Sequence, residues 1–277
     1  MLQDIVEYLV CPHCGQALEL TDGGPAALRC PDRHTFDVAR QGYANLLPGD
    51  AHTGTGDTAA MVAARDAFLG AGHYAPIAAA LAGAAPGGDC VADLGAGTGY
   101  YLAAVLDARP QARGLALDIS KFALRRAARA HPRAGAVVCD AWRPLPLRDQ
   151  AAAVVLNVFA PRNGPEIRRV LRPGGTLLVV SPTPAHLGEL VGELGLLAVD
   201  ERKQQRTAAT LGPHLDFQGS TEHTFPMLLD HRAVRTVVDM GPSAWHTDPA
   251  RLAGQIAGMP PSVPVTASVT LSVFTRS

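Results

Sequence analysis

A glycine-rich segment at residues 93–99, with the sequence DLGAGTG, constrains the fold of this chain more than any other feature. It follows the apolar run 90–92 and precedes the helix-favouring run 100–106. The pattern predicts a strand, a tight loop and a helix. Alternating glycines let the backbone approach a ligand closely, and the first turn of the helix presents free amide groups to it. The segment therefore predicts a binding site for a nucleotide-type cofactor.

The spacing of these glycines argues against a dinucleotide. A nicotinamide- or flavin-binding loop carries a third glycine three residues after Gly97, where this chain has Tyr100. Asp93, which comes shortly before the first glycine, would repel a pyrophosphate, but it suits the cationic amino-acid tail of S-adenosylmethionine. The loop therefore favours S-adenosylmethionine as the cofactor.

Two further acids follow predicted strands in register with this loop. Asp118 ends the strand-like run 114–117, where it could accept hydrogen bonds from ribose hydroxyls. Asp140 follows the run 136–139, where the adenine edge would lie. One such acid alone is more often a helix cap or a turn residue, but three at successive strand ends predict a single site. The cofactor-binding residues predicted from this pattern are Asp93, Gly95, Gly97, Asp118 and Asp140.

Predicted strands and helices alternate through the rest of the chain. Its 277 residues, 47% of them hydrophobic, are enough for an α/β core and a smaller second module. Apolar strands alternating with helices predict a Rossmann-like, doubly wound and mostly parallel methyltransferase sheet. The run 263–274 alternates apolar with mostly hydroxyl residues, which predicts an antiparallel closing strand with one buried face. The other predicted elements are helices at 58–69, 76–85, 121–131, 165–171 and 185–194 and strands at 152–158 and 176–181.

Four residues near the amino terminus have the spacing of a metal site, C-x2-C-x15-C-x3-H. They are Cys11, Cys14, Cys30 and His34. Two such knuckles supply the four ligands of a tetrahedral structural zinc ion, which has no open position for catalysis. The alternatives are buried free cysteines with an incidental histidine, or His13 as a competing ligand, although the two-knuckle geometry favours Cys14. We predict one structural Zn²⁺.

A polar, glycine-rich stretch at residues 48–57 separates this module from the rest of the chain. We predict two domains, a zinc-ribbon-like module at 1–47 and an S-adenosylmethionine-dependent methyltransferase domain at 48–277. The chain contains no apolar run of about 18 residues, and its first residues do not resemble an export signal. We therefore expect a cytoplasmic protein with no membrane contact.

Several segments occur in the order found in one enzyme family. They are the metal-ligand pattern, HTFDVARQGYANLL at 34–47, MVAAR at 61–65, GHY at 72–74, and the glycine loop. Together, and over nearly the whole chain, they resemble the RlmA-type 23S ribosomal RNA (guanine-N1)-methyltransferases. NVFAPRN at 157–163 and MGPSAWH at 240–246 are similar to the branch that includes the tylosin-resistance methyltransferase TlrB.

The resemblance implies methyl transfer from S-adenosylmethionine to N1 of a guanine in a hairpin loop of large-subunit ribosomal RNA. In actinobacterial members it also implies resistance to tylosin-like macrolides. The cofactor contacts that it implies are Tyr74, Gly97, Thr98 and His186. Near the end of the strand at 152–158, Asn157 could hold the guanine edge and Phe159 could stack on the flipped base, or both could be packing residues. Guanine N1 carries a proton that a base must accept, and the sequence does not identify that base.

Charge supports an RNA substrate less directly than the motifs do. The formal net charge is −1, and residues 1–50 hold seven acids against three arginines, whereas a surface that binds phosphates should be basic. The basic residues concentrate elsewhere, and each group would equally suit a solvated helix face. One group is Lys121, Arg125, Arg126 and Arg129, and the other is Arg162, Arg168, Arg169 and Arg172.

Two other functions stay open on the sequence alone. The enzyme could methylate a small molecule or natural product, with the zinc module as a lid over a pocket that includes Phe36, Tyr43 and Trp245. Its activity would then respond little to moderate salt. Alternatively, the fold could serve as a non-catalytic RNA-binding or assembly factor, although the intact glycine loop and its acids argue against a lost cofactor site. The expected partner is a ribosomal RNA hairpin, and a homodimer stays open.

Overall fold

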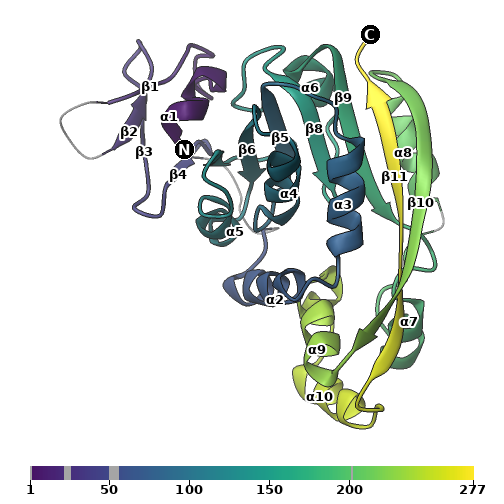
Figure 1. The fold of residues 1–277 in the computed structure, drawn as a ribbon. Coiled ribbons are helices and arrows are strands. Elements are labelled where there is room, and N and C mark those ends of the chain that lie inside the picture. Colours follow the sequence, from purple (N-terminus) through teal and green to yellow (C-terminus); the bar gives the residue numbers. More distant parts are fainter. Residues whose placement is uncertain (1, 22–25, 50–55, 201) are drawn as a thin grey trace.

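The computed structural model describes residues 2–21, 26–49, 56–200 and 202–277. Within these residues the centre is an eight-stranded sheet of order β10-β11-β9-β8-β5-β6-β7-β4 (Figure 1). Neighbouring strands from β9 to β4 are parallel, while β11 is antiparallel to both β9 and β10. The predicted doubly wound sheet and its antiparallel closing strand are therefore confirmed. The strands are β4 (Tyr43–Asn45), β5 (Cys90–Leu94), β6 (Arg113–Asp118), β7 (Ala134–Val138), β8 (Ala152–Val158), β9 (Leu171–Pro182), β10 (Asp216–Leu229) and β11 (Val263–Thr275).

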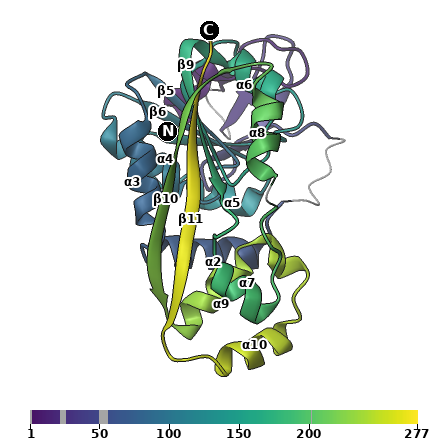
Figure 2. The ribbon, with the colours of Figure 1, turned by 90° about the vertical axis from the view of Figure 1, so that its right-hand side faces the viewer.

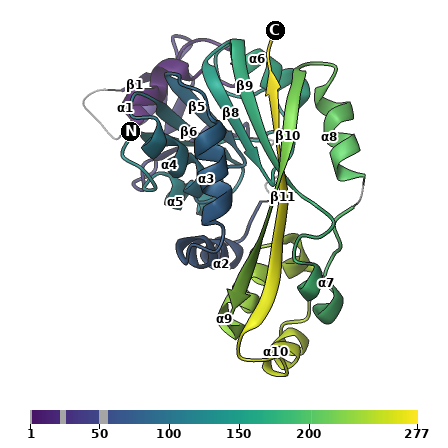
Figure 3. The same cartoon turned by 45° about the vertical axis from the view of Figure 1, so that its right-hand side comes forward.

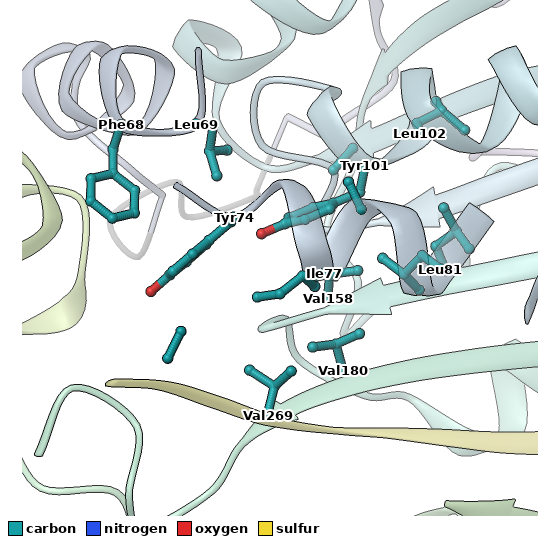
Figure 4. Close-up of a cluster of buried hydrophobic side chains, with 14 of the residues drawn as sticks. Phe68, Leu69, Tyr74, Ile77, Leu81, Tyr101, Leu102, Val158, Val180 and Val269 are labelled. Carbon is teal, nitrogen blue, oxygen red and sulfur yellow. The ribbon is translucent and has the colours of Figure 1, made fainter. Parts of the chain in front are cut away.

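Helices cover both faces of this sheet because its central strands are apolar on both sides. Every residue of β5, β7 and β8 is buried, as expected for parallel strands between two helical layers. On one face Leu81 of α3 and Leu102 of α4 join a cluster with Val180 (Figure 4). On the other face α1 and α6 contribute Ile5 and Ile167. The helices are α1 (Leu2–Ile5), η1 (Val6–Tyr8), α2 (Ala59–Gly70), α3 (Ala75–Ala84), α4 (Tyr100–Ala108), α5 (Lys121–Ala127) and α6 (Gly164–Val170).

The amino-terminal module is joined to one edge of the central sheet. Strands β1 (Glu19–Leu20), β2 (Ala27–Arg29) and β3 (Thr35–Asp37) form a small antiparallel sheet. The next strand, β4, pairs with β7 instead and becomes the edge strand of the large sheet. Ile5 packs tightly on β7, since a Cβ on Gly135 would lie 2.4 Å from Ile5 Cγ1. Residues 50–55 of the predicted linker lie outside the described residues.

The carboxyl-terminal hairpin carries the chain beyond the sheet. Strand β11 pairs with β10 along its length, but it pairs with β9 only over residues 269–275. Its other half projects past the sheet and ends among helices that form a separate lobe (Figures 2 and 3). Helix α2 lies between this lobe and the parallel strands and packs against α9 (Figure 1). The helices of this lobe are α7 (Gly188–Leu194), α9 (His231–Asp239), η2 (Pro242–Trp245) and α10 (Pro249–Ala257). Helix α8 (Lys203–Leu211) instead lies near α6, beside the parallel strands (Figure 2).

Three predicted boundaries differ from the structure by three residues or more. Helix α5 ends at Ala127, not at 131, and Pro132 disfavours helical backbone at the residue before it. Helix α7 begins at Gly188, not at 185, because Leu187 has a left-handed φ of 57°. Strand β9 begins at 171, not at 176, directly after α6. Helices α8, α9, η2 and α10 and strand β10 were not predicted from the sequence.

Among the described residues, no single helix is long and apolar enough to cross a membrane. Helices α2 and α3 meet that test by length and composition only when they are taken together, and they are bent by 79° at the break between them. Both helices contribute buried residues to the core, including Phe68 and Leu81 (Figure 4).

Candidate cofactor site and metal centre

The glycine loop between β5 and α4 forms a backbone cradle. Gly95 has a φ of 75°, and a Cβ there would lie 2.5 Å from the Ala160 side chain, so only glycine fits. Gly97 has a φ of 54°, which also favours glycine. The loop is anchored to the next strand because the Gly95 and Ala96 amides both donate to the Leu117 carbonyl, at 2.8 and 3.1 Å.

A cavity of about 730 Å³ lies at the carboxyl ends of the parallel strands. The glycine loop and the ends of β6, β7 and β8 form one side of it. Residues of α2, α7, α9 and η2 form the other side, so the lobe covers the site. This size and position suit a cofactor together with part of a substrate, because ligands of doubly wound sheets bind at the carboxyl edge.

Asp118 and Asp140 both line this cavity, as the sequence predicts. Asp118 Oδ2 accepts the Gly97 amide at 2.9 Å, and its Oδ1 accepts the Ser120 amide at 2.8 Å. A carboxylate can accept further hydrogen bonds, so this fixed geometry leaves room for ribose hydroxyls. Burial raises the pKa of Asp118. Asp140 Oδ1 accepts the amide of Trp142, whose exposed indole also lines the cavity.

Asp93 lies in the core just before the loop and does not itself line the cavity. Only 1% of the residue is exposed, and among the described residues neither carboxylate oxygen has a hydrogen-bond partner. Burial, and then the negative charge of Asp118, raise the pKa of Asp93 to about 8. A buried carboxylate without a partner, next to a left-handed glycine cradle, fits a cofactor that carries a positive charge.

An aromatic cluster closes the cavity near the end of β8. Tyr74 Oη lies 3.0 Å from His186 Nε2, and His186 Nδ1 accepts the Ser268 amide at 3.1 Å. A neutral His186 therefore carries its hydrogen on Nε2 and donates it to Tyr74. Burial raises the pKa of Tyr74, which keeps its hydroxyl protonated. The Phe159 ring is 6.3 Å from the Tyr74 ring and 5.9 Å from the His186 ring, and the residue is 39% exposed.

The structure thus brings most of the predicted site residues to one cavity. Those that line it are Tyr74, Gly95, Gly97, Thr98, Asp118, Asp140, Phe159 and His186. Asn157 does not join them. It is fully buried, and its Nδ2 donates to the Pro161 carbonyl at 2.7 Å, which holds the loop that carries Phe159. Its Oδ1 is buried and has no hydrogen-bond partner among the described residues. This burial favours the packing alternative for Asn157, and its direct contact with guanine stays a prediction.

Several lining residues escaped the sequence analysis. Asp57 and Arg65 come from the segment before β5, and Met240 and Ser243 come from the lobe. The only signal for Arg65 was its place in the MVAAR segment, to which no role was attached. Met240 and Ser243 belong to the MGPSAWH segment at 240–246, to which no role was attached either, and only the folded lobe brings them to the cavity.

The metal ligands converge as predicted. The ligand atoms of the four residues Cys11, Cys14, Cys30 and His34 all lie within 4.8 Å of one another. His34 Nδ1 is 3.5 Å from Cys11 Sγ and 3.4 Å from Cys30 Sγ, and Cys14 Sγ is 3.6 Å from Cys30 Sγ. Tetrahedral zinc with standard bond lengths gives edges of about 3.8 Å between sulfurs and about 3.6 Å between sulfur and nitrogen. The three measured distances match this geometry, so the site fits Zn²⁺, and Cys14, not His13, is the fourth ligand.

Tight turns shape the two knuckles. The Cys11 amide donates to the Gln16 carbonyl at 2.8 Å, and the Gly15 amide donates to the Cys11 carbonyl at the same distance. In the second knuckle Arg33 adopts a left-handed φ of 66°, and the Cys30 amide donates to the His34 carbonyl at 3.1 Å. The exposed His13 packs its ring against His34 and Phe36. The closed ligand set makes this a structural metal centre.

These features define an S-adenosylmethionine-dependent methyltransferase that carries a structural zinc ribbon. Comparison with known proteins agrees: residues 9–53 match the family model "RlmA, N-terminal", a zinc ribbon, and residues 91–175 match a methyltransferase domain. The chain is 55% identical to the 23S rRNA (guanine(748)-N(1))-methyltransferase of Streptomyces fradiae, over 99% of this chain and 98% of that protein. It is 57% identical, over 99% of each chain, to a Micromonospora griseorubida protein whose name assigns it 23S rRNA (guanine-N(1)-)-methyltransferase activity provisionally. The chain belongs to the family of RlmA-type 23S rRNA (guanine-N1)-methyltransferases.

Solved structures share the fold at lower sequence identity. A methyltransferase in complex with the Trm112 activator of Haloferax volcanii superposes with a TM-score of 0.53 and 20% identity, over 80% of this chain and 98% of that chain. YcgJ from Bacillus subtilis gives a TM-score of 0.50 and 16% identity, over 70% of this chain and 94% of that one. These likenesses concern the fold alone.

Proposed function

We propose that this enzyme methylates N1 of a guanine in a hairpin loop of large-subunit ribosomal RNA. The observation that carries the proposal is the full-length identity of 55–57% to 23S rRNA guanine-N1 methyltransferases, together with a cavity that fits their cofactor. A ribosomal substrate places the enzyme in the cytoplasm. We also infer that methylation of this loop accompanies resistance to tylosin-like macrolides.

The side chains around the cavity have mainly a positioning role. Bound S-adenosylmethionine supplies an activated methyl group, so the protein must align the acceptor nitrogen with it. Phe159, partly exposed at the cavity wall, offers a ring on which a flipped guanine can stack. Neutral His186 cannot accept the guanine proton on Nε2, because Nδ1 already accepts the Ser268 amide and Nε2 carries the hydrogen. Its contact with Tyr74 instead fixes the phenol ring beside the cofactor.

The two basic groups predicted from the sequence differ in how free their side chains are to contact RNA phosphates. Arg169 bonds to Glu166 and Asp149, Arg172 pairs with Asp89, and Arg168 donates to the His214 carbonyl. Arg162 donates to Ser181 at 2.7 Å. This second group is therefore occupied within the protein and adds little to an RNA surface.

Exposed cations on and after α5 are free of acidic partners. In the part of the chain that the structure describes, Lys121, Arg125 and Arg129 form no ion pair. Lys121 Nζ and Arg125 Cζ lie 5.5 and 5.4 Å from the centre of the Phe122 ring. Lys121 begins α5, two residues after the cavity-lining Ile119. A Cβ on Gly42 would lie 3.8 Å from Ala128, which places the turn of the exposed Arg40 near the other end of α5. We assign this strip, Lys121, Arg125, Arg129 and Arg40, to RNA phosphates.

Reversing charge on the strip should weaken RNA binding. In the double variant Arg125→Glu/Arg129→Glu we expect the Kd for the RNA hairpin to rise at least about tenfold at low salt, and the slope of log K against log salt to fall by about 2. Arg172→Glu, at the opposite end of the sheet, should leave the slope unchanged. Fluorescence anisotropy over a KCl series measures both. Equal salt-dependence slopes for the wild type and the double variant would show that the strip does not contact the RNA.

The proposed function itself is tested by methyl transfer from labelled S-adenosylmethionine to unmethylated large-subunit RNA, followed by mapping of reverse-transcription stops. A single stop at one hairpin-loop guanine is the expected result. Protein that binds the cofactor and holds zinc but transfers nothing to RNA would contradict the proposal and favour a small-molecule acceptor.

A further inference from the structure

Few positive groups face the cavity. Among its described lining residues they are Arg65, Arg206 and, when protonated, His186. The Arg206 side chain is 65% exposed and pairs with Asp200 at 2.6 Å. Both ring nitrogens of His186 already have hydrogen-bond partners. Arg65 also has an acidic partner, Asp57, but its side chain is only 26% exposed, so it is the cation best placed to bind an anionic group of a ligand in the cavity.

Arg65 is held directly beside the glycine loop. A Cβ on Gly97 would lie 3.5 Å from both Cδ and Nη1 of Arg65, so the guanidinium lies along this glycine. Its Nη1 pairs with Asp57, and its Nη2 donates to the Met240 carbonyl at 2.9 Å. These two contacts fix the group and leave its Nε hydrogen and one hydrogen on each terminal nitrogen without a partner among the described residues. Only 26% of the side chain is exposed, so a charge contact there is weakly screened.

The order of the strands sets how the cofactor must lie. Strands β7, β6 and β5 are neighbours in the sheet, and their carboxyl ends present Asp140, Asp118 and the glycine loop to one cavity. With adenine beside Asp140 and ribose beside Asp118, the rest of the cofactor continues over the glycine loop. The amino-acid tail, which carries one carboxylate and one ammonium group, then lies next to Gly97.

We propose that Arg65 binds the carboxylate of the cofactor's amino-acid tail. The planar guanidinium suits a carboxylate because it offers parallel N–H donors, and its bond to Met240 links the bound tail to the lobe that covers the cavity. This inference concerns the cofactor alone. Its failure would leave the proposed RNA substrate untouched, since no RNA enters the experiment.

The test compares two ligands that differ only in the tail. S-adenosylhomocysteine carries the amino-acid group, and 5′-methylthioadenosine lacks it. In the variant Arg65→Met we expect calorimetry to show a ten- to hundredfold higher Kd for S-adenosylhomocysteine, as for a lost charge-assisted hydrogen bond. The Kd for 5′-methylthioadenosine should change by less than about threefold. That unchanged affinity also shows that the variant is folded.

Two further variants sharpen the result. Arg126→Met removes another arginine that contacts α2, through Asp66, but it lies outside the cavity and should change neither Kd. Arg65→Lys keeps the charge and should recover part of the lost affinity for S-adenosylhomocysteine. Equal losses for both ligands in Arg65→Met would assign Arg65 a purely structural role. No loss for either ligand would place the carboxylate elsewhere.

Discussion

Replacing Cys30 with serine should release the zinc ion and unfold the small amino-terminal sheet. The strands β1, β2 and β3 are only two or three residues long, too little to stay folded alone. Structural zinc contributes on the order of 10 kcal/mol to folding of such modules, so its loss exceeds what their packing can supply. We expect less than one zinc ion per ten chains in the purified variant.

The unfolding should stop at the borders of the ribbon. Ile5 packs on β7, Leu9 bridges Leu147, and β4 pairs with β7, so both ends of the module are tied to the central sheet. Hydrogen exchange should therefore become fast over about residues 11–38 and stay slow in β5 to β8. Cys90→Ala, which alters a buried cysteine outside the metal site, should keep full zinc content. Full zinc occupancy in Cys30→Ser would contradict the ligand set.

Structural features that depend on residues close together in the sequence could be predicted from the sequence. The glycine loop, the acids at the ends of β6 and β7, and the two knuckles each depend on a short pattern whose geometry is set locally. Strand β8 was predicted with its observed bounds because a run of buried apolar residues fits a central parallel strand. The zinc site followed because two ligand pairs with fixed spacing leave few geometric choices.

Features that depend on distant segments could not be predicted. Arg65 meets Met240 across 175 residues, and no periodicity signals such a contact. Strand β10 is largely exposed and polar over residues 216–222, and its burial alternates only over 223–229, so most of it lacks the pattern of a half-buried strand. Asn157 lies near a strand end, as a substrate-binding residue would, and only the structure shows that it is fully buried and that its Nδ2 donates to the Pro161 carbonyl. The cavity wall formed by the lobe depends on tertiary packing in the same way.

The ligand-free enzyme should lose stability as the pH rises from about 5.5 to 8, and Asp93→Asn should remove most of that loss. The pKa of Asp93 is 3.8 in an unfolded chain and about 8 in the folded protein. The folded state therefore binds a proton that the unfolded state has released. This contribution is complete below pH 4 and disappears as the pH passes 8.

The size of the effect makes it measurable. Between the two pKa values the free energy of unfolding should fall by about 1.4 kcal/mol per pH unit, a total on the order of 5 kcal/mol. The free energy of unfolding of both proteins is measured by urea unfolding between pH 5.5 and 8.5. This range avoids the lower pH at which protonation of the ligands would release zinc. The absolute stability of Asp93→Asn also depends on how well the asparagine amide packs in the core. The decisive quantity is therefore how steeply the free energy of unfolding changes with pH in the variant and in the wild type. Asp89→Asn, at an exposed acid just before β5, should leave the slope unchanged. Parallel curves for the wild type and Asp93→Asn would show that Asp93 is ionised in the folded protein, and that a charge partner reaches it even without the cofactor.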